Sequence, residues 1–180
     1  MKKTRCSWAN PANPLYLHYH DHEWGVACHD EKQLFEMLIL EGAQAGLSWE
    51  TILNKRENYR EAFDGWDIKK IAQYDAAKVE ELMQNAGIVR NRLKINATII
   101  NANAYFQLCK DVGSLDAYLW SHVKAKPVRN KQRVITSEVS DAISKDLKKR
   151  GFKFVGSTII YAYMQAIGMV NDHSEECDWA

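Results

Sequence analysis

The stretch "RLKINATIINANAYFQLCK", residues 92–110, is the longest helical pattern in the chain and contains neither glycine nor proline. Apolar side chains recur along two of its sides at helical spacing. One side carries Leu93, Ala97, Ile100, Ala104 and Leu108, and the other carries Ile95, Ile99, Ala102 and Phe106. We therefore expect one long helix that is buried on both sides at the centre of the fold.

The rest of the chain shows the same helical periodicity. Asp30 followed by Gln33 is typical of a capping box, and Ser48 predicts the start of a helix that continues to residue 63. Further helices are expected over 67–73, 76–86 with Gly87 as C-cap, 114–122, 137–150 ending at Gly151, and 157–167 ending at Gly168. Only "RVIT", residues 133–136, fits an extended segment.

These patterns predict an all-α protein, a helical bundle in a single domain over residues 1–180. We expect its terminal segments, about 1–30 and 155–180, to form a second lobe. The chain has 180 residues, of which 46% are apolar and 26% charged, as in a globular protein with a sizeable core. It shows neither a signal-like apolar run at its start nor an apolar stretch long enough to span a membrane, so we expect a cytoplasmic protein without a membrane partner.

Basic residues are clustered although the net charge is only +1. The first cluster comprises Lys124, Lys126, Arg129, Lys131 and Arg133, and the second comprises Lys145, Lys148, Lys149, Arg150 and Lys153. A solvated loop and a helix C-terminus account for most such runs. Phosphate binding is the alternative interpretation, and the sequence alone leaves both open.

Cysteine and histidine residues lie near both ends of the chain. The closing stretch "HSEEC", residues 173–177, places His173 and Cys177 four residues apart, so both could bind one metal ion. The first thirty residues add Cys6, His18, His20, His22, Cys28 and His29. A site with two cysteines and two histidines is possible by composition, but no zinc-finger spacing joins these residues, and ordinary surface histidines fit as well.

A carboxylate and several aromatic residues also stand out. Glu41 precedes a glycine-rich turn and Trp49 follows it, while Trp8, Tyr16, Tyr19 and Trp24 crowd the N-terminal segment. A helix-end carboxylate and core aromatics are the plain interpretation. The alternative is a pocket for a flat, electron-poor base.

Long stretches of the chain resemble a known enzyme family. They are "YHDHEWG" (19–25), "LFEMLILEGAQAGLSWETILNKRENYREAF" (34–63), "AGIVRNRLKI" (86–95), "LKKRGFKFVGSTIIYAYMQAIGMVNDH" (147–173) and the terminal cysteine. They are similar to the 3-methyladenine DNA glycosylase I family, bacterial base-excision-repair enzymes of the helix-hairpin-helix superfamily. The similarity covers nearly the whole chain and is weak only around 111–135. It implies a monofunctional glycosylase that flips 3-methyladenine out of alkylated double-stranded DNA and hydrolyses its bond to the sugar, leaving an abasic site.

The resemblance also implies roles for particular residues. Cys6, His20, His173 and Cys177 would hold one structural zinc ion. Glu41 would be the pocket carboxylate, surrounded by the rings of Tyr16, Tyr19 and Trp49, with Trp8 on the same wall and Trp24 in the core. Leu47 would fill the gap left in the duplex, and the hairpin "GFKFVGST" (151–158) would contact phosphate through Gly151, Lys153, Gly156 and Ser157.

Some questions stay open at this point. The sequence lacks the hairpin-associated lysine of bifunctional relatives, and Asp172 adjoins His173, so we expect Asp172 to be structural. We expect a monomer. A non-catalytic reader of alkylated DNA and a zinc hydrolase are the competing functions, and Glu41 could serve catalysis or recognition alone.

Overall fold

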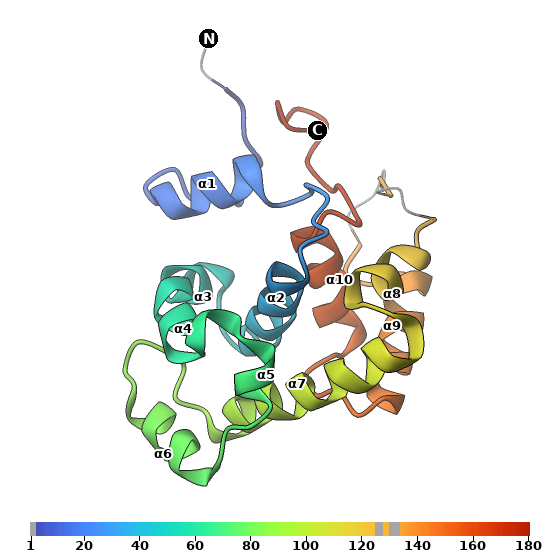
Figure 1. The fold of residues 1–180 in the computed structure, drawn as a ribbon. Helices are drawn as coiled ribbons and strands as arrows, with labels where there is room; N and C mark the ends of the chain where they lie inside the picture. The colour runs from blue at the N-terminus through green and yellow to red at the C-terminus, as the bar shows by residue number, and fades with distance from the viewer. Residues whose placement is uncertain (1–2, 125–127, 130–133) are drawn as a thin grey trace.

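The computed structural model describes residues 3–124, 128–129 and 134–180 (Figure 1). Within these ranges the fold consists of helices, and the one pairing of extended segments is an isolated parallel bridge between Val128 and Val170. The helices are α1 (Pro14–His22), α2 (Glu31–Ala43), α3 (Trp49–Asn54), α4 (Arg56–Ala62), the 3-10 helix η1 (Asp64–Trp66), α5 (Ile68–Ile71), α6 (Ala76–Gln84), α7 (Arg92–Val112), α8 (Leu115–Ser121), α9 (Glu138–Lys149) and α10 (Ser157–Ala166). The all-α prediction is confirmed.

Helix α2 forms the centre of the core. It contacts α3, α7, α8 and α10, and every residue from Leu34 to Ala43 is buried. Figure 1 shows α2 between the group formed by α3 and α4 and the group formed by α8, α9 and α10. An apolar helix that is buried on all sides in this way fixes where its C-terminal residues lie. Those residues include Glu41.

Helix α7 is only half buried, so the prediction of burial on both sides is wrong. Leu93 is 72% exposed and Ile100 is 42% exposed. The buried side instead includes two polar residues, Thr98 and Asn101. Apolar residues on the solvent side of a helix are common, because a protein surface has too few polar atoms to cover it.

Most predicted helix boundaries are confirmed, and the largest error is a break that was not predicted. The Asp30 side chain accepts a hydrogen bond from the Gln33 N–H at 2.8 Å, and Gly151 and Gly168 have positive φ values of 93° and 74° after α9 and α10. The helix that starts after Ser48 breaks at Lys55, which separates α3 from α4.

Smaller differences concern a C-cap and an extended segment. The C-cap of α6 is Asn85 rather than Gly87. Of the predicted extended segment 133–136, residue Arg133 lies outside the described residues and 134–136 form no strand.

The two ends of the chain lie side by side (Figure 1). The Thr4 N–H donates to the Asp178 carboxylate at 2.8 Å, and the Asp178 N–H donates to the Thr4 carbonyl at 3.0 Å. Arg5 pairs with Asp21 on α1, and Asp172 accepts hydrogen bonds from Tyr161 and Gln165 on α10, so each terminal segment is also tied to a helix. Among the described helices, none combines the length and apolar character that crossing a membrane requires.

Candidate active site

A cavity of about 540 Å³ opens beside the C-terminal end of α2. Its walls come from α1, α2, α3, α10, the two terminal segments and the described residues Arg129, Val134 and Ile135. The structure brings five of the predicted pocket residues to this cavity: Trp8, Tyr16, Tyr19, Glu41 and Trp49. The volume falls in the range of small-molecule sites and accommodates a nucleobase.

The carboxyl group of Glu41 is buried without a charged partner. Its residue is 4% exposed, and no hydrogen bond or ion pair joins its carboxyl group to any residue in the described part of the chain. Burial raises the pKa of Glu41 to about 8, because a carboxylate loses its hydration inside the protein. With a pKa near 8, the carboxyl group of Glu41 is mostly protonated at neutral pH.

Aromatic rings surround Glu41. The ring centroids of Tyr19 and Trp49 lie 5.2 Å apart, and those of Trp8 and Tyr16 lie 5.4 Å apart. Burial raises the pKa of Tyr19 well above its ordinary value, so its phenol stays neutral. The indole N–H of Trp49 is buried and has no hydrogen-bond partner among the described residues. Electron-rich ring faces of this kind attract a cation.

Trp24, expected in the core, is both buried and part of the cavity wall. Its ring packs edge-on against Trp8, with centroids 4.8 Å apart. The ring centroids of Trp8 and His20 lie 5.1 Å apart, so the aromatic wall continues to the buried cluster formed by Cys6, His20, His173 and Cys177.

Sequence reasoning missed the wall that α10 provides. Thr158, Tyr161, Ala162 and Gln165 line the cavity. Their spacing of three, four and seven residues places them on one helix face, a signal that the sequence carries. Asp172 also borders the cavity, where it accepts hydrogen bonds from the Tyr161 hydroxyl at 2.6 Å and the Gln165 amide at 2.8 Å.

Cys6, His20, His173 and Cys177 form one buried cluster. All four potential ligand atoms lie within 4.8 Å of one another. The Cys177 Sγ lies 3.5 Å from the His20 Nε2 and 3.4 Å from the His173 Nδ1. Within the described residues no other group of three or more such side chains comes together, so His18, His22, His29 and Cys28 belong to no metal cluster.

The surroundings of this cluster fit a zinc ion. The second ring nitrogen of His20 lies 2.8 Å from the Asp21 carboxylate, and that of His173 lies 3.0 Å from the Trp24 carbonyl. Such partners orient metal-binding histidines and turn the free ring nitrogen toward the ion. The Ser174 N–H also points at the Cys6 sulfur at 3.4 Å, which favours a thiolate. Two thiolates and two imidazoles are the ligands of closed structural zinc sites.

Two loops carry the residues predicted to contact DNA. Leu47, in the loop 44–48 between α2 and α3, is 42% exposed and follows Gly46, whose φ is 79°. In the hairpin 151–158, Lys153 is exposed, and no atom lies within 4 Å of where a Cβ would stand on Gly151 or Gly156. Space is therefore open beside the Cα of both glycines, although the Gly151 N–H already donates to the Lys148 carbonyl at 3.0 Å.

The remaining predicted DNA contact, Ser157, is engaged within the protein, and the two basic clusters are partly engaged or partly outside the described residues. The Ser157 hydroxyl bonds to Asp141 and Ser140, so it does not cap α10. Arg150, a member of the second basic cluster, pairs with Asp146 at 2.7 Å and Asp111 at 2.8 Å. Of the first basic cluster, Lys126, Lys131 and Arg133 lie outside the described residues, while Arg129 borders the cavity.

Comparisons with known proteins decide the family. The model of the methyladenine glycosylase family matches residues 8–180. The chain belongs to this family. It is 51% identical to DNA-3-methyladenine glycosylase 1 of Escherichia coli K12 over 96% of the chain and 95% of that protein. It is 47% identical to DNA-3-methyladenine glycosylase of Haemophilus influenzae, over 97% and 96%.

Solved structures of family members share the fold. A crystal structure of 3-methyladenine DNA glycosylase I superposes with a TM-score of 0.93 at 48% identity, covering 97% of this chain and 98% of the other. The Staphylococcus aureus enzyme, studied for its recognition of 3-methyladenine, also gives a TM-score of 0.93 at 37% identity, covering 97% and 95%. The helical architecture is therefore that of the methyladenine glycosylases.

Proposed function

We propose that this protein is a DNA glycosylase that hydrolytically removes 3-methyladenine from alkylated DNA and leaves an abasic site. The observation that carries the proposal is Glu41, a buried carboxyl group without a charged partner in the described residues, facing a cavity walled by aromatic rings. Relatives and solved neighbours named for this activity support it.

The charge of the lesion explains these residue types. Methylation at N3 gives the nucleotide's adenine a positive charge, so the base leaves as a neutral molecule and needs little acid catalysis. Each ring contact with a cation contributes about 0.5–2 kcal/mol. A cation also lowers the pKa of a nearby carboxyl group, so Glu41 ionises as the charged base enters. Unmethylated adenine brings no charge and leaves Glu41 protonated.

The base reaches the cavity only after leaving the duplex. Extruding it costs a few kcal/mol, and a side chain in the vacated space offsets part of that cost. The exposed Leu47 is suited to this role. We infer that the hairpin binds phosphate through the backbone N–H of Gly156 and the charge of Lys153, while Gly151 leaves room for the DNA backbone to approach. The partner is then double-stranded DNA, bound by a monomer.

We further infer that Cys6, His20, His173 and Cys177 hold one structural zinc ion. It would join residues 1–30 and 155–180 into a terminal lobe within the single domain 1–180. Because four side chains fill the ligand set, no position is left for an activated water molecule. The expected result is one zinc per chain by elemental analysis, and clearly less in Cys177→Ala. Full zinc content in that variant would contradict the assignment.

Release of the free base tests the function. DNA treated with a methylating agent is incubated with the protein, and the supernatant is analysed by chromatography for 3-methyladenine. We expect release by the wild type and by Glu61→Gln, an exposed carboxylate control on α4, and much slower release by Glu41→Gln. Binding of methylated DNA without release would indicate a reader. Activity that chelation abolishes while the fold survives would indicate a zinc hydrolase.

A further inference from the structure

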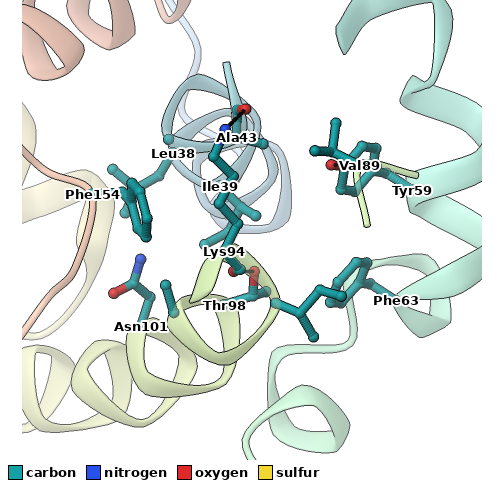
Figure 2. A pocket seen from close by; sticks show the side chains of 13 residues that line it. Leu38, Ile39, Ala43, Tyr59, Phe63, Val89, Lys94, Thr98, Asn101 and Phe154 are labelled. Atoms are coloured by element: carbon teal, nitrogen blue, oxygen red, sulfur yellow. Dashed lines mark hydrogen bonds between the residues drawn. The ribbon is translucent and has the colours of Figure 1, made fainter. Parts of the chain in front are cut away.

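A polar stripe on the buried side of α7 is not explained by the base pocket. Lys94, Thr98 and Asn101 occupy positions separated by four and three residues, so they share one helix face. They border a cavity of about 20 Å³ that also touches Gly42 and Phe154 (Figure 2). Polar groups are placed in a core only where they find partners, and two of these three bind loops that the proposed function assigns to DNA.

Lys94 holds the end of α2. Its ammonium donates to the carbonyls of Ala43 at 2.8 Å and Ala45 at 2.6 Å, and Figure 2 shows the first of these bonds. The last carbonyls of a helix lack partners within the helix and attract a cation. Leu47 stands two residues after Ala45. Lys94 therefore fixes the start of the loop 44–48 that carries Leu47.

Asn101 holds the hairpin 151–158. Its amide donates to the Lys153 carbonyl at 3.0 Å, and its side-chain oxygen accepts from the Lys153 N–H at 2.7 Å. The next residue, Phe154, has a φ of 55°, a left-handed conformation that residues other than glycine rarely adopt. Asn101 thus satisfies both backbone groups of the residue that precedes this turn, and the Asn101 and Phe154 side chains lie next to each other in Figure 2.

The two loops are also in direct contact with α2. A Cβ on Gly42 would lie 3.1 Å from the Phe154 Cβ, so the hairpin packs closely against the last turn of the helix that carries Glu41. One face of α7 and this contact set the distance between the loop 44–48 and the hairpin. Because Lys94 and Asn101 lie on one continuous helix of 21 residues, both loops are anchored to the same element.

We propose that Lys94 and Asn101 are positioning residues that hold the loop 44–48 and the hairpin at the separation that one DNA duplex requires. The inference rests on the proposed function, which assigns DNA contact to both loops. Lys94 acts by positioning Leu47, which contributes only after the base has left the base stack of the duplex. Asn101 acts through the phosphate contacts of the hairpin, which are the same before and during the reaction.

Steady-state kinetics on methylated duplex DNA separates the two roles. Asn101→Ala should raise KM about tenfold and change kcat less than about twofold, because it weakens binding of ground state and transition state alike. Lys94→Met should lower kcat about tenfold and change KM less than about twofold, because it weakens only the extruded state. Lys94→Arg, which keeps a charged donor, should recover most of kcat.

Asn103→Ala is the matched control. Asn103 lies on the same helix, and its amide donates to the carbonyls of Ala72 and Ile99, away from both loops. We expect wild-type kinetics from this variant. Free 3-methyladenine should quench tryptophan fluorescence equally in all variants, whereas a general loss of folding would weaken this binding in parallel with activity.

Several results would overturn the inference. One is a KM shift in Asn101→Ala no larger than that in Asn103→Ala, and another is an unchanged kcat in Lys94→Met. A third is that Asn101→Ala or Lys94→Met loses binding of free 3-methyladenine together with activity, because that would indicate a general loss of folding. If the wild type releases no base at all, the proposed function fails. The role of Asn101 can then still be tested by fluorescence anisotropy with undamaged duplex DNA. Asn101→Ala should weaken DNA binding more than Asn103→Ala does.

Discussion

Two glutamates on α2 are buried to nearly the same extent, but their pKa values are shifted in opposite directions. Glu36 is 3% exposed and Glu41 is 4% exposed. Burial favours the neutral form of Glu36, but hydrogen bonds from Arg56 and Arg60 outweigh it and lower the pKa of Glu36 below its ordinary value. Glu41 has no such partner in the described residues, and burial raises its pKa to about 8.

Under the proposed function, this contrast separates a carboxylate that stabilises the fold from one that binds a ligand. The guanidinium groups that surround Glu36 are supplied by the fold, so its charge is satisfied before anything binds. Under the proposed function, the charge of Glu41 would be satisfied only when the cationic base enters the cavity. Ionising a buried carboxyl group that has no charged partner costs free energy. A positively charged base beside the carboxylate would lower that free energy.

Replacing Glu36 should have the largest effect on stability. Glu36→Gln leaves the buried Arg56 with only Glu23 as a charged partner, and we expect a loss of about 3–5 kcal/mol in the free energy of unfolding. Urea denaturation measures this, with the exposed Glu57→Gln as control. A loss below about 1 kcal/mol would mean that Glu36 is not the structural member of the pair.

Replacing Glu41 should stabilise the protein, and increasingly so at higher pH. The unfolded chain releases the Glu41 proton near pH 4.5, whereas the folded chain keeps it up to about pH 8, so the wild type loses stability as pH rises through this window. Glu41→Gln does not lose stability in this way, because a glutamine side chain does not titrate. Its advantage in urea denaturation should grow by up to about 1.4 kcal/mol per pH unit between pH 5 and 8. An advantage that does not change with pH would contradict the raised pKa.

Removing the ring beside Glu41 should have a smaller effect. Trp49→Ala takes away a stacking surface worth about 1–2 kcal/mol, which lowers kcat/KM for base release about 5- to 30-fold. Trp49→Phe keeps a ring face and should retain most activity. Equal losses in the two variants would show that packing, rather than stacking on the base, accounts for the effect of Trp49.

The sequence predicted local features of the fold well. Asp30 as N-cap, and Gly151 and Gly168 as helix ends, depend only on neighbouring residues, and all three are confirmed. The break at Lys55 and the exposure of Leu93 depend on which helices pack together, and that is not a local property. Long-range packing therefore sets the limit of the sequence-based prediction.

The candidate site was predictable only in part, again because long-range packing brings its residues together. Composition provided candidates for a metal cluster, but only the resemblance selected four of them, since Cys6 and Cys177 meet through the fold of the whole chain. Asn101 was missed because an asparagine within an apolar helix suggests a solvent-facing position. Glu36 was missed because its partners, Arg56 and Arg60, are twenty or more residues away.

The pH dependence of base release tests the central claim most directly. We measure kcat/KM for release of 3-methyladenine from methylated DNA between pH 6 and 9, in the wild type and in Glu41→Gln. If the ionised carboxylate recognises the cationic base, wild-type kcat/KM rises about tenfold per pH unit up to the pKa near 8 and then levels off. The variant should be slower throughout and lack this rise. Identical profiles for the two proteins would contradict the account.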